Sequence, residues 1–222
     1  MKLLISDDVF SIFPEMEIHG VIFHDIDLNS VPNISFDDIT TIDNEKIENE
    51  LIIWKDVYKR FPRDKKAKVS IDYLFKAIRN GKLKKISSLV DIYNYASLIS
   101  YSPFGGECLH SMKDGELALT IANGEEIFQP LFSNDYEKPL SGEIIWRFGH
   151  NDVVCRSMNF KESDKFKITD STNSVIFLSE KPFQNMQGEP ESGINFLLSS
   201  LSNVSKSYLS FNLNSNNSYL YF

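Results

Sequence analysis

Hydrophobic residues recur at helical spacing through the region from 43 to 99. The clearest apolar stripe consists of Ile47, Leu51, Trp54, Tyr58 and Phe61. These positions share one face of a helix with about 3.6 residues per turn, and Pro62 predicts where that helix ends. A second helix is predicted from Ser70, as its N-cap, to Gly81, as its stop, and a third from 87 to about 99. The residues SPFGG, 102–106, then predict a turn.

The remaining segments have the patterns of strands. Residues 17–28 are rich in β-branched and aromatic residues and predict a strand, followed by a loop at 29–42. From 115 onward the hydrophobic period is two, which predicts strands at 115–122, 125–132, 143–148, 152–160, 165–169 and 174–180. A short helix is predicted at 193–201, before closing strands at 207–213 and 217–222. We expect a single α+β domain over residues 1–222, with a helical layer packed on a mainly antiparallel sheet.

Composition narrows the class of protein. The 222 residues are 42% hydrophobic and 24% charged, as in ordinary globular proteins. No apolar run approaches the roughly 20 residues that cross a bilayer, and MKLLISDDVF does not read as a signal peptide. Two cysteines make no disulfide framework. These features predict a cytoplasmic protein without a membrane partner.

The charge is unevenly distributed. The net charge is −8, yet the segment 55–85 holds twelve basic residues against three acidic ones and carries +9, which leaves −17 for the rest. Such asymmetry is typical of a polyanion-binding face on an acidic body. The alternative is that these cations are the solvated faces of two helices.

Cys108 and His110 raise the question of a metal or thiol site. A zinc site needs three or four ligands, commonly in two close pairs, and no second pair has a zinc-like spacing. Thiol catalysis needs a lowered cysteine pKa and an orienting third group, which two neighbouring residues do not establish. We therefore expect no metal and no cofactor. The chain also lacks a nucleophile elbow, a Walker loop and a dinucleotide-binding fingerprint.

A set of polar residues is left as the candidate site. Its members are Asn94, Ser97, Gly105, Gly106, Glu107, Arg156, Asn159 and Glu162. The two glycines permit close backbone approach to a ligand. Arg156 lies in a hydrophobic, strand-like run and needs an anionic partner, which is either a ligand or a structural carboxylate such as Glu107 or Glu143.

These motifs also occur in an order that resembles a known family. The series begins with VDIYN, followed by SL and P-x-GG. It continues with A-x-GEE-x-F and GEIIW, and it ends with VVCR-x-x-N followed by D, IT and T. The series resembles the stand-alone B3/B4-domain proteins, which are similar to the B3/B4 region of the phenylalanyl-tRNA synthetase β subunit. The match extends from about 10 to 180. The resemblance implies an α+β fold with a cleft between the helical layer and the sheet, where mischarged aminoacyl-tRNA is hydrolysed by a positioned water.

The family's catalytic positions are only partly matched. A His follows the turn proline by two residues in the synthetase, and here that place is taken by Gly105. The later glutamate of the family falls near Glu162. The Asp of stand-alone members falls at Cys108, with Glu107 just before it. The resemblance thus implies Glu107 and Glu162 as the catalytic residues, with one or the other orienting water and the amides of Gly105 and Gly106 holding the carbonyl oxygen.

The resemblance implies tRNA or aminoacyl-tRNA as the partner, bound through the basic segment 55–85. The expected function is a tRNA-binding domain with possible trans-editing hydrolase activity. The alternative is a non-catalytic binding module for tRNA or a small amino-acid-like ligand. Asn94, Ser97, Gly105, Gly106, Arg156 and Asn159 are the expected substrate-binding residues in either case.

Overall fold

The protein is described by a computed structural model that covers residues 1–39 and 42–222, so residues 40 and 41 of the predicted loop 29–42 lie outside the description. The helices are α1 (Asp7–Ile12), α2 (Asn44–Val57), α3 (Ser70–Arg79), α4 (Ser88–Ser100) and α5 (Pro190–Leu201). The strands are β1 (Lys2–Ile5), β2 (Glu17–Ile26), β3 (Gly105–Cys108), β4 (Glu116–Ile121), β5 (Ile144–Phe148), β6 (Asp152–Arg156), β7 (Lys161–Glu162), β8 (Val175–Lys181), β9 (Ser205–Leu213) and β10 (Tyr219–Tyr221).

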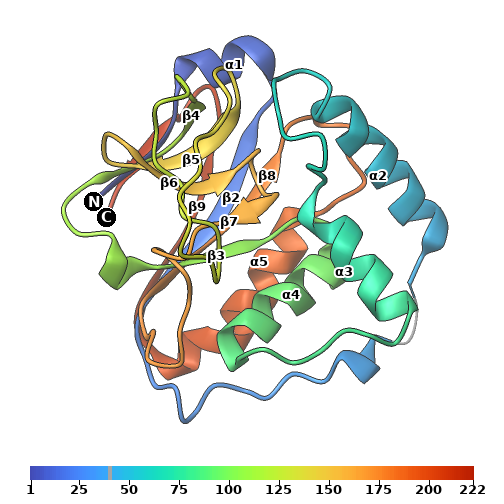
Figure 1. Cartoon of the computed structure of the whole chain (residues 1–222). Helices are drawn as coiled ribbons and strands as arrows, with labels where there is room; N and C mark the ends of the chain where they lie inside the picture. Colours follow the sequence, from blue (N-terminus) through green and yellow to red (C-terminus); the bar gives the residue numbers. More distant parts are fainter. Residues whose placement is uncertain (40–41) are drawn as a thin grey trace.

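The strands form two sheets (Figure 1). One sheet has the order β10-β1-β4-β5-β6-β7 and the other the order β3-β8-β2-β9. Strands β1 and β4 pair in parallel, and the other pairs of neighbouring strands are antiparallel. Because β1 pairs with β10, the two ends of the chain lie side by side. The predicted α+β class with a mainly antiparallel sheet is confirmed.

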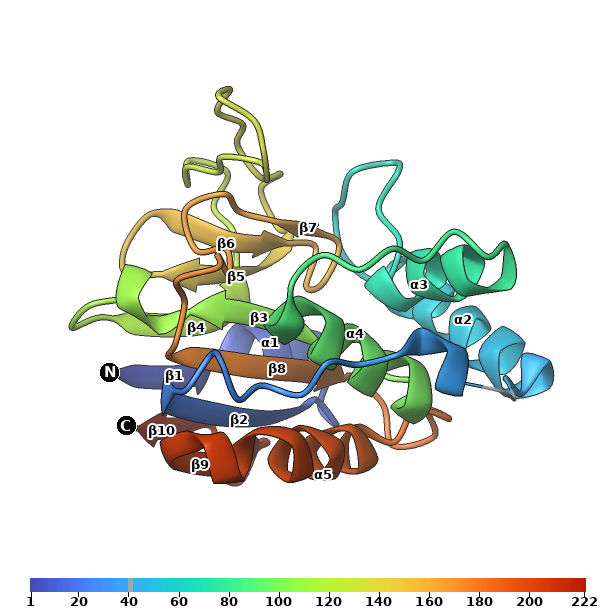
Figure 2. The ribbon, with the colours of Figure 1, turned by 90° about the horizontal axis from the view of Figure 1, so that it is seen from below.

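The layers are a helical layer, the four-stranded sheet and the six-stranded sheet (Figure 2). Helices α4 and α5 pack on the outer face of the four-stranded sheet, where Ile92, Phe177 and Leu197 are fully buried. These residues belong to one hydrophobic core. A second hydrophobic core fills the space between the two sheets and extends to α2 and α3. Its members include Ile22, Leu119, Trp54 and Phe75, and its position places the inner faces of both sheets next to these two helices.

Helices α2 to α5 form where their sequence patterns predict them, whereas α1 was not predicted. The Asp43 side chain caps α2 by accepting from Lys46 N at 3.0 Å, and Ile47 and Trp54 of the predicted stripe are buried. Gly81 ends α3 with φ of +59°, a left-handed conformation that glycine adopts without strain. The prediction for Ser70 was wrong in detail: Val69 occupies the N-cap position and Ser70 is the first helical residue.

The predicted turn over SPFGG is shifted. Tyr101, with φ of +57°, ends α4, and the two glycines lie in β3 rather than in a turn. Close approach explains Gly106, because a Cβ there would lie 2.9 Å from the ring of Phe177 on the paired strand.

Three predicted strands differ from the observed ones. The segment 125–132 makes only isolated bridges, and its Pro130 has no N–H to donate to a ladder. The segment 165–169 is irregular. Its buried Phe166 accepts one backbone hydrogen bond, from Cys108 N, which does not continue into a strand ladder. The segment 152–160 is divided into β6 and a turn, in which Ser157 and Met158 have φ of +49° and +64°.

Candidate functional site

Polar side chains from both sheets meet in the space between them. On the six-stranded sheet, Trp146 pairs with Cys155, which pairs with Glu162, so the three side chains stand in a row across β5, β6 and β7. On the four-stranded sheet, Glu107 of β3 faces the same way as Gly105, and Glu180 lies further along β8. The two rows line one small cavity of about 10 Å³. That volume is at the lower limit for one water molecule.

A β-bulge sets which β6 side chains face this cavity. Arg147 pairs with Val153 but Trp146 pairs with Cys155, so Val154 is an extra residue on β6. Val154 and Cys155 therefore both line the cavity, while Val153 lies on the opposite face of the sheet.

Glu107 and Glu162 form a buried carboxyl pair. Burial raises the pKa of Glu107 well above its usual range, and the negative charge of Glu162 and a hydrogen bond to Glu162 raise it further. Burial also raises the pKa of Glu162. Glu162 Oε2 is buried and has no hydrogen-bond partner among the described residues. Burial and the adjacent charge thus both disfavour ionisation of the two carboxyl groups at the same time.

Glu180 is the third buried carboxyl group of the cluster. It accepts hydrogen bonds from Trp146 Nε1 at 2.6 Å and from Asn159 Nδ2 at 2.9 Å. Burial raises its pKa to about 7, although these two hydrogen bonds lower it. Glu107, Glu162 and Glu180, with Trp146, Cys155 and Asn159, are called the carboxyl cluster from here on.

Asn159 is held in the cluster by the turn after β6 and by Tyr58. The Tyr58 hydroxyl lies 3.0 Å from the carbonyl oxygen of Ser157 and 3.1 Å from Asn159 Oδ1. Met158, also in the turn, donates its amide to Ile144 O at 2.9 Å. Two successive non-glycine residues at positive φ are strained, and these contacts fix them in that conformation.

A cationic groove lies between α2 and α3, on the other side of Tyr58. Its volume is about 580 Å³, and its lining consists of Leu51, Trp54, Lys55, Tyr58, Lys59, Arg63, Lys65, Ala67, Lys68, Val69, Asp72 and Lys76. Asp72, the one acid of the lining, is paired with Lys76 at 2.6 Å. Half of the twelve basic residues of segment 55–85 thus line one groove. Others point elsewhere: Arg60 packs on Phe183 at 4.5 Å.

The structure brings some of the predicted site residues together. Gly105, Glu107, Asn159 and Glu162 all line the cavity of the carboxyl cluster. A Cβ on Gly105 would lie 3.4 Å from Glu162 Oε1, so this glycine leaves room beside the carboxyl group.

Arg156 is not part of this group. It faces away from Cys155, its neighbour on β6, and makes a bidentate pair with the fully buried Glu143 at 3.1 and 2.7 Å. Its remaining nitrogen donates to Glu137 at 3.1 Å. Of the two roles left open by the sequence, this geometry matches the structural pairing with Glu143.

The α4 residues also lie outside the cavity. The Ser97 hydroxyl donates to Tyr93 O at 2.8 Å and accepts from Phe104 N at 3.1 Å, which fixes the connection from α4 to β3. Asn94 is buried on α4 and does not line the cavity.

The two glycine amides differ. Just beyond the paired residues of β3 and β8, Leu109 N donates to Ser174 O. Backbone amides along a strand point alternately to its two sides, so the amide of Gly105 points toward β8 like that of Leu109, and the amide of Gly106 points toward the open edge of the sheet. Only Gly106 therefore leaves an amide free of the strand ladder.

The sequence did not reveal several residues in or beside the carboxyl cluster. Glu180 lies on the same face of β8 as the buried Ile176 and Leu178. An acidic residue at a position where the strand pattern predicts burial was the signal that could have identified it. Tyr58 was assigned only to the apolar stripe. Tyr93 of α4 lies outside the cavity and packs on Phe177, and burial followed by the charges of Glu162 and Glu107 raises its pKa.

The cysteines carry no reactive chemistry here. Both are free and buried, and burial followed by the charges of Glu162 and Glu107 raises the pKa of the Cys155 thiol well above its usual range. His110 is exposed, outside the cluster. Within the described ranges 1–39 and 42–222, no three His, Cys, Asp or Glu side chains group as metal ligands, and no helix is long and apolar enough to span a bilayer.

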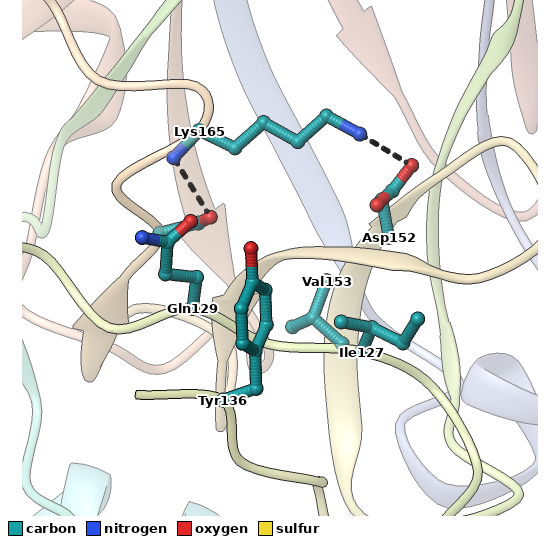
Figure 3. A pocket seen from close by; sticks show the side chains of 7 residues that line it. Ile127, Gln129, Tyr136, Asp152, Val153 and Lys165 are labelled. Atoms are coloured by element: carbon teal, nitrogen blue, oxygen red, sulfur yellow. Dashed lines mark hydrogen bonds and ion pairs between the residues drawn. The ribbon is translucent and has the colours of Figure 1, made fainter. Parts of the chain in front are cut away.

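A separate cavity of about 570 Å³ lies on the outer face of the six-stranded sheet (Figure 3). It is lined by Ile127, Gln129, Tyr136, Asp152, Val153, Ser163 and Lys165. Lys165 extends across it to Asp152, with Nζ 2.8 Å from Oδ2. None of the predicted site residues lines this cavity.

Comparison with known proteins places this geometry in a family. The model of a family described as the B3/4 domain matches residues 53–185, which is more than half of the sequence, and the chain belongs to that family. The predicted family is therefore confirmed. A solved N-terminal fragment of the phenylalanyl-tRNA synthetase β subunit from Pyrococcus horikoshii is similar, with 9% identity and a TM-score of 0.45 over 95% of this chain and 53% of that one. The chain thus spans about half the length of that fragment. Comparison with curated proteins gave no match.

Proposed function

We propose that the protein binds tRNA and removes the amino acid from mischarged aminoacyl-tRNA, as a trans-editing hydrolase. The observation that carries this proposal is a pair of carboxyl groups, Glu107 and Glu162, that line one buried cavity next to a groove lined by six cations. Membership of the B3/4 domain family supports a role connected with tRNA. The groove supplies charge for the nucleic acid, and the pair supplies an acid and a base for the ester.

Hydrolysis divides the work between the two carboxyl groups. Glu162, as the carboxylate, accepts a proton from water while the water oxygen adds to the ester carbonyl carbon. The carbon–oxygen bond to the ribose then breaks, and the protonated Glu107 gives its proton to the departing ribose oxygen. The products are the free amino acid and tRNA with a free hydroxyl. The proton on Glu162 returns to Glu107 along their hydrogen bond, and the Gly106 amide is the donor available for the carbonyl oxygen.

The aminoacyl group enters only if the cavity opens, because about 10 Å³ holds no more than one water. The position of the pair favours such opening. Glu107 lies on β3 and Glu162 on β7, and each is the last strand of its sheet. Strand β7 belongs to the other sheet from β3 and is only two residues long, so few backbone hydrogen bonds to β6 hold it in place.

The second candidate function is a non-catalytic binding module for tRNA or a small amino-acid-like ligand. The closed cavity favours it, since this arrangement of side chains leaves no room for an ester beside Glu162. The two candidates share the groove and differ in turnover.

A deacylation assay separates them. The protein is incubated with tyrosyl-tRNA(Phe) and a panel of other mischarged tRNAs, and the release of amino acid is followed. We expect turnover that falls by about 100-fold or more in Glu162→Gln and in Glu107→Gln, because each variant removes a proton-transfer group. Glu48→Gln, an exposed acid of α2, is the matched control. Binding without turnover by the folded protein contradicts the hydrolase and supports the binding module.

A salt titration tests the nucleic-acid part. The affinity for tRNA should fall steeply as the salt concentration rises, because binding to phosphates releases counterions. An affinity that does not depend on salt would contradict contact through the basic segment.

A further inference from the structure

The cationic groove combines two chemistries that a phosphate-backbone contact alone does not require. Lysine and arginine side chains form its rim, and apolar side chains, Leu51, Ala67 and Val69, contribute to its lining. Its volume, about 580 Å³, is that of a small-molecule site rather than of a flat nucleic-acid surface. We propose that the groove binds one nucleotide, as a free nucleoside monophosphate or as the 3′-terminal nucleotide of an RNA. This deepens the proposed function and rests on it for the RNA source.

The phosphate has a defined place on the rim. Three cations of the lining, Lys55, Arg63 and Lys65, have no acidic partner among the described residues, unlike Lys76 and Lys59. Arg63 Nε is buried and has no hydrogen-bond partner among the described residues. The terminal N–H groups of this guanidinium are the ones that can donate to a phosphate oxygen in the groove, and the opposite charges favour that contact.

The base is recognised weakly. The Trp54 indole N–H is already used by Glu50 Oε1 at 2.9 Å, and the Tyr58 hydroxyl by Ser157 and Asn159. Both aromatic rings are almost fully buried, so they offer little surface for stacking. The contacts left for a base are apolar ones, which do not distinguish adenine from the other bases. We therefore expect affinity to depend on the phosphate and not on the identity of the base.

Equilibrium dialysis with radiolabelled AMP tests the proposal on the wild-type protein. Binding should saturate, weaken with salt and be similar for AMP, CMP, GMP and UMP, with adenosine and inorganic phosphate each much weaker. The double substitution Arg63→Gln/Lys65→Gln should weaken AMP binding by about tenfold or more. Lys82→Gln/Lys84→Gln, two exposed cations of the same segment outside the groove, should leave it unchanged.

Fluorescence provides a second readout. The chain has two tryptophans, so Trp146→Phe leaves Trp54, in the groove lining, as the only one. AMP should change its emission with the same midpoint as in dialysis. If this variant does not fold, dialysis alone decides.

Competition identifies the source of the nucleotide. Intact tRNA should displace AMP, and a circularised RNA, which has no terminal nucleotide, should displace it at least about tenfold less well. Displacement by neither makes a free nucleotide the ligand. The proposal is overturned if the wild-type protein binds no AMP, or if the folded Arg63→Gln/Lys65→Gln variant binds it unchanged. AMP binding without ester hydrolysis contradicts only the hydrolase, whereas hydrolysis without AMP binding contradicts only the nucleotide site.

Discussion

Tyr58 and Asn159 are joined by a hydrogen bond of 3.1 Å across the boundary between the cationic groove and the carboxyl cluster. The tyrosine ring lines the groove, and the asparagine amide lines the cavity and donates to Glu180. One side-chain contact therefore separates the cations of segment 55–85 from three buried carboxyl groups.

Tyr58→Phe removes the hydroxyl and should lower the free energy of unfolding by about 1–3 kcal/mol, because it leaves the buried Ser157 carbonyl oxygen without this donor. Urea denaturation with a linear extrapolation measures the change. Tyr73→Phe is the matched control: this residue of α3 is half exposed, and its loss of a hydroxyl should change stability by less than about 0.5 kcal/mol. Equal effects of the two substitutions would contradict the assigned role of Tyr58.

Glu180 should make stability depend on pH. Its pKa is about 7 in the folded protein against 4.5 as its ordinary value, so the unfolded chain releases this proton first as the pH rises. Between about pH 4.5 and pH 7 the Glu180 contribution to stability therefore falls with rising pH, by about 3 kcal/mol in total. The raised pKa values of Glu107 and Glu162 act in the same direction.

Glu180→Gln isolates this contribution. Glutamine keeps one acceptor oxygen, enough for one of the two donors Trp146 and Asn159, and it does not ionise. The lost acceptor lowers stability equally at both pH values, so the stability of the variant relative to wild type should rise by about 3 kcal/mol between pH 4.5 and pH 7.5. Urea denaturation at both pH values measures the difference, and Glu48→Gln should leave the wild-type dependence intact. A wild-type protein whose stability relative to Glu180→Gln does not change with pH would contradict the raised pKa.

Arg156 is expected to stabilise the fold and not to contact substrate. Arg156→Met leaves the fully buried Glu143 without its cation, which should cost about 3–5 kcal/mol of unfolding free energy. The double substitution Arg156→Met/Glu143→Leu should recover much of this loss, because it removes both buried charges. A small loss of stability with a large loss of tRNA affinity would instead indicate that Arg156 binds the ligand.

Cys155 should be unreactive in the native protein. Its side chain is 2% exposed, and burial next to Glu162 disfavours the thiolate, which is the reactive form. In a Cys108→Ser variant, labelling of Cys155 by a thiol reagent should be complete in urea and should be limited by unfolding without it. Rapid labelling of the native variant would show that the space between the sheets is open to solvent.

The helical parts of the fold were predictable because their signals are local. The stripe on α2 and the left-handed Gly81 after α3 depend on residues within a few turns of one another. The site was predictable only in part. Glu107 and Glu162 were found by family resemblance, but Glu180 and Trp146 join them only through the register of β8 and β5. A bulge at Val154 inverts the facing of half a strand, and no local pattern reveals it.

The two glycines of β3 should respond differently to a methyl group. In Gly106→Ala the new Cβ meets the Phe177 ring at 2.9 Å and Ile168 at 3.0 Å, so packed side chains have to move and stability should fall by about 1–3 kcal/mol. In Gly105→Ala the Cβ lies 3.4 Å from Glu162 Oε1, an ordinary contact, and stability should change by less than about 1 kcal/mol. That methyl group does narrow the space beside Glu162. Gly105→Ala should therefore lower deacylation activity while leaving AMP binding and the urea midpoint near wild type, and an equal loss of stability in both variants would contradict the different surroundings of the two positions.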